Sequence, residues 1–579
     1  MPSPSKNKPA SQDLDRNVRG QMAQMTGGLA MSAFSAAWLD WVTHLAQSPA
    51  RQLELQQQAL ARAADNGAFA LRALGGEAVS PAEGFDGAPE KRFGDPAWSQ
   101  FPFNLLARAH QNTQALMKES VRDVGGLSAY HAQLLDFAVR MAADASSPAN
   151  SLASNPELLA LTQAEQGQNL VRGLQHMVED MQRTLQGGEP VGTDAFEPGK
   201  AVAVTPGKVI FRNDLIELIQ YAPTTPEVHA EPLLIVPAWI MKYYILDLSP
   251  RNSMVKYLVD QGHTVFMMSW KNPDEGDRDL GMEDYVEQGL RAAIDAVAAV
   301  VPQHRIHAVG YCIGGTLLAI GAAALARAQD ERLASITMFA AQTDFSEPGE
   351  LGFFINPGQL AALDATMFNK GVLESRQMGG AFALLRGQDL VWQPLINNYL
   401  KGKRDPMIDL MAWNADGTRM PWRMHSEYLY RLYLENELAT NRFLHAGQRV
   451  RLSDIRLPMF VVGTEADHVA PWTSVYKVDN LVRSDDFTFL LTAGGHNAGI
   501  ICGPVHPKRS YQVRTRRLVD PHLAPEEWTE AAPRHPGSWW PEWQAWLAKH
   551  SSRRTKPPKM GAKAYPVLEA APGQYVRIK

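Results

Sequence analysis

The first third of the chain has a helical pattern of hydrophobic positions. Apolar residues recur there at spacings of three and four, which places them on one face of a helix, as at Trp38, Trp41, Val42 and Leu45. Glycines and a proline interrupt the pattern over 187–192, as is typical of a linker. We therefore expect a disordered tail over 1–17 and a mainly helical domain over 18–195. No motif with chemistry occurs in it, so its predicted role is packing or dimerisation.

Beyond residue 200 the pattern changes to short apolar runs separated by helical stretches. Six continuous runs predict strands that are buried on both faces, namely 233–236, 264–269, 306–309, 334–340, 459–462 and 487–491. Because strands that alternate with helices form a parallel sheet, we predict the α/β class for residues 196–579. The alternation fails between about 347 and 449, where Trp, Tyr, Asn and Met accumulate. We interpret this part as a helical insertion that caps the active site.

Composition and charge narrow the class of protein. The chain has 579 residues, of which 45% are hydrophobic and 20% charged, with a net charge of -5. This is the balance of a globular enzyme, and it gives no sign of a basic surface that binds nucleic acid. The first twenty residues are polar, and Asp40 and His44 interrupt the apolar stretch 28–46, which argues against a signal peptide or membrane span. We predict a cytoplasmic protein, although an amphipathic helix would still allow attachment to an apolar surface.

The sequence contains two cysteines, Cys312 and Cys502. Two thiols cannot build a disulfide framework or a cysteine-rich metal site, so we expect free thiols, a reducing compartment and no metal. Cys502 lies in Ile-Ile-Cys-Gly-Pro, without a turn motif around it, and is expected to pack as a small hydrophobic residue.

Cys312 lies in Gly-Tyr-Cys-Ile-Gly-Gly, residues 310–315, between a predicted strand and a run that begins a helix. This is the pattern of a nucleophile elbow, in which glycines leave room at a sharp and strained turn. The thiol would then lie at the amino terminus of the helix, whose free N–H groups favour a thiolate and an oxyanion. We expect Cys312 to be a nucleophile and the backbone amide of Ile313 to be one oxyanion donor.

An elbow nucleophile is followed along the chain by an acid and then by a histidine. Asp467 follows the apolar run 459–462, and His496 follows the run 487–491. The carboxyl ends of strands meet at the edge where an α/β sheet carries its site. We therefore expect Asp467 to orient His496, which acts as the base. His468 is a competing base, but it directly neighbours Asp467 and follows no strand of its own.

Further motifs resemble the class I polyhydroxyalkanoate synthases, which belong to the α/β-hydrolase superfamily. The likeness covers about residues 90–579. Its motifs are residues 92–93, 96–98, 217–221, 244–248, 264–266, 269–274, 310–315, 398–400, 413–414, 467–472, 495–496, 498–499, 537–540 and 571–576.

This resemblance implies an α/β-hydrolase fold with a helical cap insertion, preceded by the helical domain. It also implies an acyltransferase that polymerises 3-hydroxyacyl-CoA into polyhydroxyalkanoate and releases CoA, with the acyl group held as a cysteinyl thioester. Cys312, Asp467 and His496 correspond to the family's catalytic cysteine, aspartate and histidine. The resemblance implies no cofactor beyond the CoA that the substrate carries. As partners it implies a homodimer and the surface of polyester granules.

Some positions depart from the family pattern. Ala238 and Met241 replace the usual proline and asparagine, Asn497 replaces an apolar residue after the histidine, and Cys502 with Gly503 replaces asparagine and proline. These changes bear on substrate range and rate. Two alternatives stay open on sequence grounds. One is an intracellular depolymerase or thioesterase of the same fold, in which water replaces the hydroxyacyl acceptor. The other is a non-catalytic protein of the granule surface.

Overall fold

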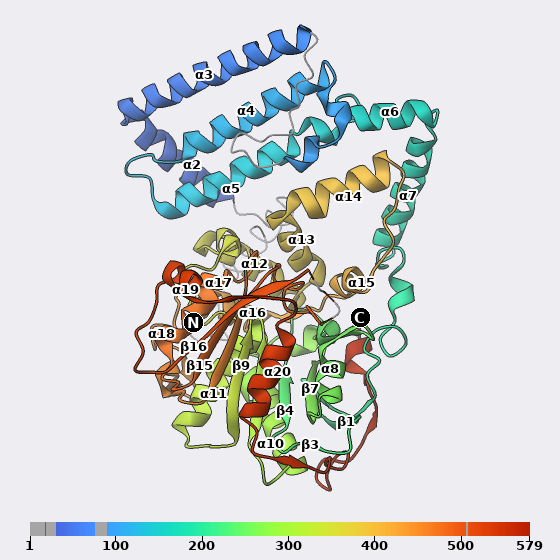
Figure 1. Ribbon diagram of the computed structural model, residues 1–579, viewed down its shortest axis with the longest axis vertical. Coiled ribbons are helices and arrows are strands. Elements are labelled where there is room, and N and C mark those ends of the chain that lie inside the picture. Colours follow the sequence, from blue (N-terminus) through green and yellow to red (C-terminus); the bar gives the residue numbers. More distant parts are fainter. Residues whose placement is uncertain (1–17, 19–30, 76–89, 505, 507) are drawn as a thin grey trace. The chain divides into compact units, whose positions relative to one another are not determined.

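The structure is a computed structural model, which describes residues 18, 31–75, 90–504, 506 and 508–579 (Figure 1). The predicted tail over 1–17 lies outside the described residues. Contacts between Cα atoms divide the chain into two units. One contains Val191–Gly379 and Met407–Lys579 and carries a large sheet, and the other contains Leu29–Pro190 and Gly380–Pro406 and is helical.

The sheet has eleven strands in the order β17-β16-β15-β14-β9-β8-β4-β7-β2-β1-β19. Their bounds are β1 Gly207–Arg212, β2 Ile216–Tyr221, β4 Leu233–Val236, β7 Val265–Trp270, β8 Ile306–Tyr311, β9 Leu333–Phe339, β14 Met459–Thr464, β15 Phe487–Thr492, β16 Ser510–Arg516, β17 Arg534–Pro536 and β19 Glu569–Ala570. The six predicted strands are confirmed as β4, β7, β8, β9, β14 and β15, each within two residues at either end.

The predicted parallel sheet is confirmed for the six predicted strands, and the flanks add antiparallel strands that were not predicted. The six central strands from β15 to β7 pair in parallel. On the flanks β2, β1 and β19, and also β16 and β17, pair antiparallel. The central strands could be predicted because they are covered on both faces and therefore have continuous apolar runs. The flanking strand β16, which lies between β17 and β15, has the mixed sequence Ser-Tyr-Gln-Val-Arg-Thr-Arg, which does not form such a run.

Helices cover both faces of the sheet, and each face has its own apolar cluster (Figure 1). On one face lie α10 (Ala292–Val300), α11 (Ile313–Arg327) and α19 (Pro525–Ala531). On the other face lie α8 (Met254–Asp260) and α20 (Trp540–Lys549). From α20, Trp543 packs edge to face on Phe339 of β9, with ring centroids 4.9 Å apart. Aromatic pairs of this geometry stabilise a core beyond the area they bury.

The helices between β9 and β14 contribute to both units. The sheet unit holds α12 (Pro357–Lys370), α15 (Asp409–Ala415) and α16 (Trp422–Tyr428), which continues as a helix over 429–434. Helix α13 (Ser375–Leu385) crosses the boundary at residue 379, and the segment 380–406, with α14 (Gln393–Leu395), belongs to the helical unit.

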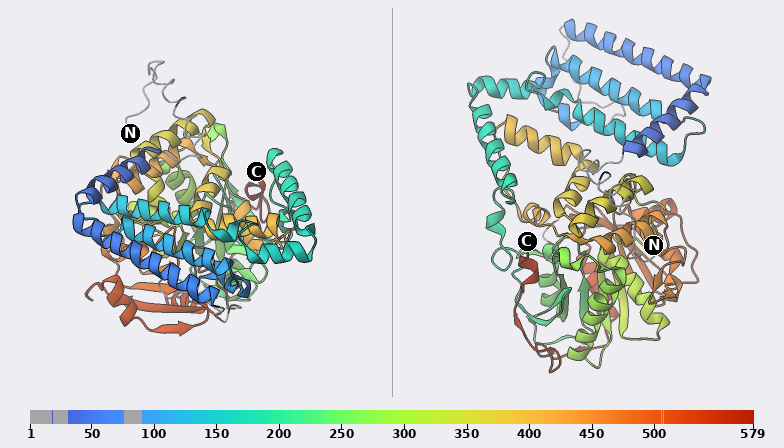
Figure 2. Two further views of the ribbon diagram at one scale, coloured as in Figure 1. Left: turned by 90° about the horizontal axis from the view of Figure 1, so that it is seen from above. Right: turned by 180° about the vertical axis from the view of Figure 1, so that it is seen from behind.

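The helical unit is built from α2 Met31–Ala46, α3 Pro49–Leu74, α4 Phe103–Val121, α5 Ala129–Ala145, α6 Pro156–Ala164 and α7 Gln168–Leu185. Figure 2 shows α3, α4 and α5 side by side, in agreement with their contacts. Helix α7 packs against residues 396–400, where Asn169 donates a hydrogen bond of 2.8 Å to the carbonyl of Leu400. Arg404 pairs with Glu179 and Asp180 of α7. These contacts join segments more than two hundred residues apart.

Among the described residues, none of the helices combines the length and the apolar composition that crossing a bilayer requires.

Candidate active site

Cys312 lies at the turn between β8 and α11, with φ 54° and ψ -128°. Such a positive φ is strained for a residue with a side chain and is typical of functional turns. The glycines make the turn possible because a Cβ on Gly310 would come within 2.3 Å of the Cα of Gly315. A Cβ on Gly315 would come within 2.5 Å of the Cβ of Ala341. The structure therefore has a nucleophile elbow at the predicted residues.

Ile313 is the first residue of α11 and is buried. Within the described part of the chain, its amide N–H has no backbone or side-chain acceptor. It lies at the amino terminus of the helix, where unpaired N–H groups and the helix dipole favour negative charge. This position suits a donor to an oxyanion that forms beside Cys312.

The loop after β4, which contains Ala238, adjoins the elbow. A Cβ on Gly314 would meet the carbonyl oxygens of Val236 and Pro237 at 2.3 and 2.5 Å. The loop is fixed from other directions as well, because Trp270 Nε1 donates to the carbonyl of Pro237 at 2.9 Å. Two segments distant in sequence thus meet here without space for a side chain.

Asp467 follows β14 and is 8% exposed. Its Oδ1 accepts hydrogen bonds from the amides of Val469 and Ala470 at 2.9 and 2.8 Å, and its Oδ2 accepts from Thr464 Oγ1 at 2.8 Å. Burial raises the pKa of the carboxyl, but the charge of His496 and these hydrogen bonds outweigh burial and lower the pKa below its usual range. Asp467 is therefore held as a carboxylate.

His496 follows β15 and connects the other two residues. Its Nδ1 lies 2.8 Å from Asp467 Oδ2, and its imidazole lies close enough to Cys312 for the charge of that side chain to act on it. Burial lowers the pKa of the imidazole, but the charges of Asp467 and Cys312 raise it well above its usual value. The competing histidine, His468, has an exposed side chain. The structure thus brings Cys312, His496 and Asp467 together in that order, the arrangement of a nucleophile, a base and an orienting acid.

Two cap tyrosines, Tyr428 and Tyr433, lie close enough to Cys312 for its charge to act on them. Burial first, and then charges that include Cys312, raise the pKa of both phenols. The ring centroids of Tyr428 and Tyr433 are 5.4 Å apart, and the ring centroid of Phe345 is 4.7 Å from that of Tyr433. Sequence reasoning did not single out these residues. The only sign of them was the accumulation of Tyr in the cap, which does not reveal which side chains face the thiol.

Cys502 is fully buried, and burial raises the pKa of its thiol. It packs among the apolar residues of the cluster that contains α20. A buried thiol with a raised pKa is a poor nucleophile. Among the described residues, no group of three His, Cys, Asp or Glu side chains could hold a metal ion.

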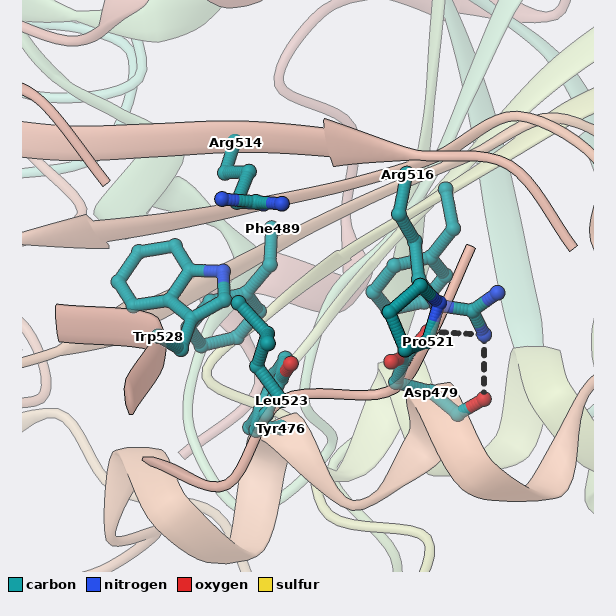
Figure 3. A pocket seen from close by; sticks show the side chains of 9 residues that line it. Tyr476, Asp479, Phe489, Arg514, Arg516, Pro521, Leu523 and Trp528 are labelled. Carbon is teal, nitrogen blue, oxygen red and sulfur yellow. Dashed lines mark hydrogen bonds and ion pairs between the residues drawn. The ribbon is translucent and has the colours of Figure 1, made fainter. Parts of the chain in front are cut away.

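Figure 3 shows a pocket whose lining includes Tyr476, Asp479, Arg516 and Trp528. Asp479 is 2% exposed and pairs with Arg516, whose Nε donates to Asp479 Oδ1 at 2.6 Å. The free space in this pocket is about 10 Å³, which is about the space that one water molecule needs. None of the three candidate catalytic residues lines it, so we assign it a structural role.

A central parallel sheet with a nucleophile elbow after a middle strand defines an enzyme of the α/β-hydrolase fold. The alpha/beta hydrolase fold family matches residues 231–501. This confirms the fold class that the sequence predicted.

The chain belongs to the poly(3-hydroxyalkanoate) polymerase family. Residues 89–258 match the family described as poly-beta-hydroxybutyrate polymerase N-terminus, and residues 9–51 match a second one, poly-beta-hydroxybutyrate polymerase N terminal. The poly(3-hydroxyalkanoate) polymerase of Methylorubrum extorquens is 41% identical over 85% of this chain and 81% of its own length. The polymerase subunits of Rhizobium meliloti and Cupriavidus necator are 37% and 38% identical, over 98% and 85% of this chain and 94% and 83% of their own lengths. The resemblance seen in the sequence is therefore confirmed.

Proposed function

We propose that this enzyme polymerises 3-hydroxyacyl-CoA into polyhydroxyalkanoate and releases CoA, through a covalent thioester on Cys312. The observation that carries the proposal is the convergence of three residues, with Cys312 at a strained elbow, His496 near it, and Asp467 hydrogen-bonded to His496. The names of the relatives, which are polymerases of 3-hydroxyalkanoates, support the substrate class.

In the first step the enzyme takes the acyl group from CoA. His496 accepts the thiol proton, and the sulfur of Cys312 attacks the carbonyl carbon of the thioester. The oxyanion that forms accepts a hydrogen bond from the amide of Ile313. The bond between the carbonyl carbon and the CoA sulfur then breaks, and the CoA thiolate takes the proton from His496. Loss of one oxyanion donor typically lowers such a rate by about 100- to 1000-fold.

In the second step an ester bond forms. The 3-hydroxyl of another hydroxyacyl unit loses its proton to the His496–Asp467 pair, and its oxygen attacks the acyl carbon on Cys312. The bond between carbon and sulfur breaks, and the proton returns to the thiolate of Cys312. A cysteine suits this sequence because a thioester of similar energy replaces the substrate thioester, so the acyl group stays activated for transfer to the hydroxyl.

The deciding experiment supplies 3-hydroxybutyryl-CoA to purified protein, beside a Cys312→Ala variant, and follows both CoA release and polymer mass. We expect CoA release with polymer from the wild type and neither from the variant. A matched Cys502→Ala variant should keep turnover, because Cys502 is fully buried and burial raises the pKa of its thiol. CoA release with free 3-hydroxybutyrate would identify a thioesterase instead, and substantial turnover by Cys312→Ala would refute the thioester.

We also propose that the helical unit binds the surface of the polyester product. Helix α7 keeps its polar contacts on one face and exposes apolar side chains along the other, namely Val171, Leu174, Met177, Val178, Met181 and Leu185. Amphipathic helices of this kind bind apolar surfaces in proportion to the area they bury. Replacing Leu174 and Met181 by glutamine should weaken cosedimentation with poly(3-hydroxybutyrate) particles and leave the oligomeric state unchanged. Unchanged cosedimentation would contradict this assignment.

A further inference from the structure

Asn497 makes a contact with the nucleophile elbow through its side chain. Its Oδ1 accepts a hydrogen bond of 2.5 Å from the hydroxyl of Tyr311. Tyr311 is the last residue of β8 and precedes Cys312, whereas Asn497 directly follows His496. One hydrogen bond therefore connects the residue before the nucleophile with the residue after the base.

The same tyrosine also contacts the imidazole directly. The ring of Tyr311 is stacked on that of His496, with centroids 5.7 Å apart and an angle of 28° between the planes. Tyr311 is 2% exposed. Burial first, and then the charges of Cys312 and Asp467, raise the pKa of its phenol well above the usual value. The phenol therefore stays protonated, and its hydroxyl is a permanent donor to Asn497.

The loop that carries His496 has several backbone anchors, including hydrogen bonds from the amide of Ala466 to the carbonyl of Gly494 at 2.9 Å and from the amide of Gly499 to the carbonyl of Gly495 at 2.8 Å. Residues 493–498 are only partly buried. Besides Asp467, which holds Nδ1, the carbonyl of Asn497 accepts hydrogen bonds of 3.0 Å from the amides of Ile500 and Ile501. Asn497 thus ties the loop to the following turn through its backbone and to the elbow through its side chain.

We infer that Tyr311 and Asn497 act as a positioning pair that holds the imidazole of His496 against the thiol of Cys312. This inference rests on the proposed nucleophilic role of Cys312. Neither side chain takes part in bond making. Their effect is to fix the plane of the imidazole, and a base that is misplaced transfers a proton less effectively. An apolar residue at position 497 would remove the acceptor and leave the ring stacking alone.

The charges of Asp467 and Cys312 act on His496. The pair is therefore tested best through the reactivity of the Cys312 thiol toward an alkylating reagent at different pH values. We propose to measure the pH dependence of alkylation by iodoacetamide in the wild type, Asn497→Leu, Tyr311→Phe and the double variant, and to subtract the rate of Cys312→Ala. Tyr575→Phe serves as the matched control, because its hydroxyl donates to the carbonyl of Asn213 and does not contact the three catalytic candidates.

Each single variant should lower the alkylation rate at pH 7 by about 3- to 10-fold, as expected for one hydrogen bond between neutral groups. Each single variant should also move the midpoint of the pH profile of alkylation. The double variant should show no further loss of rate, because both substitutions remove the same hydrogen bond. Wild-type pH profiles in both single variants, even with a lowered melting temperature, would overturn the inference and leave a structural contact. Alkylation of Cys312 does not require turnover. Failure of the proposed function would be seen as absent CoA release by the wild type, and it can therefore be told apart from failure of the positioning pair, which the alkylation profiles measure.

Discussion

Gly314 lies against the carbonyl oxygen of Val236, so that a Cβ at this glycine would come within 2.3 Å of that oxygen. This approach joins the first turn of α11, which directly follows Cys312, to the end of β4. The amide of Ile313 precedes Gly314, so its position depends on this contact.

Gly314→Ala should therefore damage the site as well as the fold. We expect a loss of about 1–3 kcal/mol in stability from overpacking, and a fall of about 100-fold or more in CoA release as the oxyanion donor moves. Urea unfolding and a CoA-release assay measure the two effects. Gly379→Ala, in α13, is the control, because nothing lies within 4 Å of its Cβ position. A fully active Gly314→Ala enzyme would show that the elbow tolerates this displacement.

Asp467→Asn tests the orienting acid. The substitution keeps the size of the side chain but removes the charge that helps to raise the pKa of His496. The imidazole should lose its fixed orientation and its preference for the protonated state, and turnover should fall by about 1000- to 10,000-fold, as in other triads of this logic. Steady-state CoA release at several pH values measures this. The control is His468→Gln at the exposed neighbour, which should retain near wild-type activity. A fall of less than tenfold in Asp467→Asn would contradict the role of the acid.

The central sheet and the elbow could be predicted from sequence because each is encoded locally. A strand that is buried on both faces leaves an apolar run of its own length, as at β4, where the predicted and observed bounds agree. The elbow leaves fixed glycine spacing around Cys312. Asp467 and His496 follow strands directly, so the predicted strands placed both at one edge of the sheet.

Other features depend on contacts that no local pattern encodes. The strands β1, β16 and β17 lie toward the edges and mix polar with apolar residues, so nothing distinguishes them from loops. The cap phenols Tyr428 and Tyr433 are more than a hundred residues from Cys312 in sequence. The packing of the segment 380–406 against α7 depends on steric fit at Gly173, which a helical pattern does not reveal.

Gly173→Ala tests that packing. A Cβ at Gly173 would come within 1.9 Å of the carbonyl oxygen of Tyr399, and backbone cannot move aside cheaply. The substitution should loosen residues 396–406 from α7, and limited proteolysis should cut there faster than in the wild type. Gly67→Ala, inside α3 with nothing within 4 Å of its Cβ position, should resist cleavage at least as well as the wild type. Equal cleavage of Gly173→Ala and the wild type would refute this contact.

The buried His307 predicts that the unfolding free energy of the protein falls at acid pH. It lies in β8 and is fully buried, with Nδ1 2.7 Å from Ser335 Oγ and Nε2 3.2 Å from Ser551 Oγ. Burial is the main cause that lowers its pKa to about 4. In the unfolded chain the imidazole of His307 has an ordinary pKa of about 6.5. Below pH 6.5 it therefore binds a proton in the unfolded chain but stays neutral in the folded protein until the pH approaches 4. Stability should be unaffected by this group above pH 7 and should fall as the pH drops from about 6.5 toward 4.

At pH 5 this one histidine should cost about 2 kcal/mol of unfolding free energy. His307→Gln, which keeps hydrogen-bonding groups but does not titrate, should lose less stability than the wild type between pH 7.5 and 5, by about that amount. Urea unfolding followed by tryptophan fluorescence at the two pH values measures the difference. His468→Gln, at an exposed side chain, should lose as much as the wild type. If His307→Gln and the wild type lost stability equally, the imidazole of His307 would have to be protonated in the folded protein or reached by solvent. The acid sensitivity would then have to come from other buried groups.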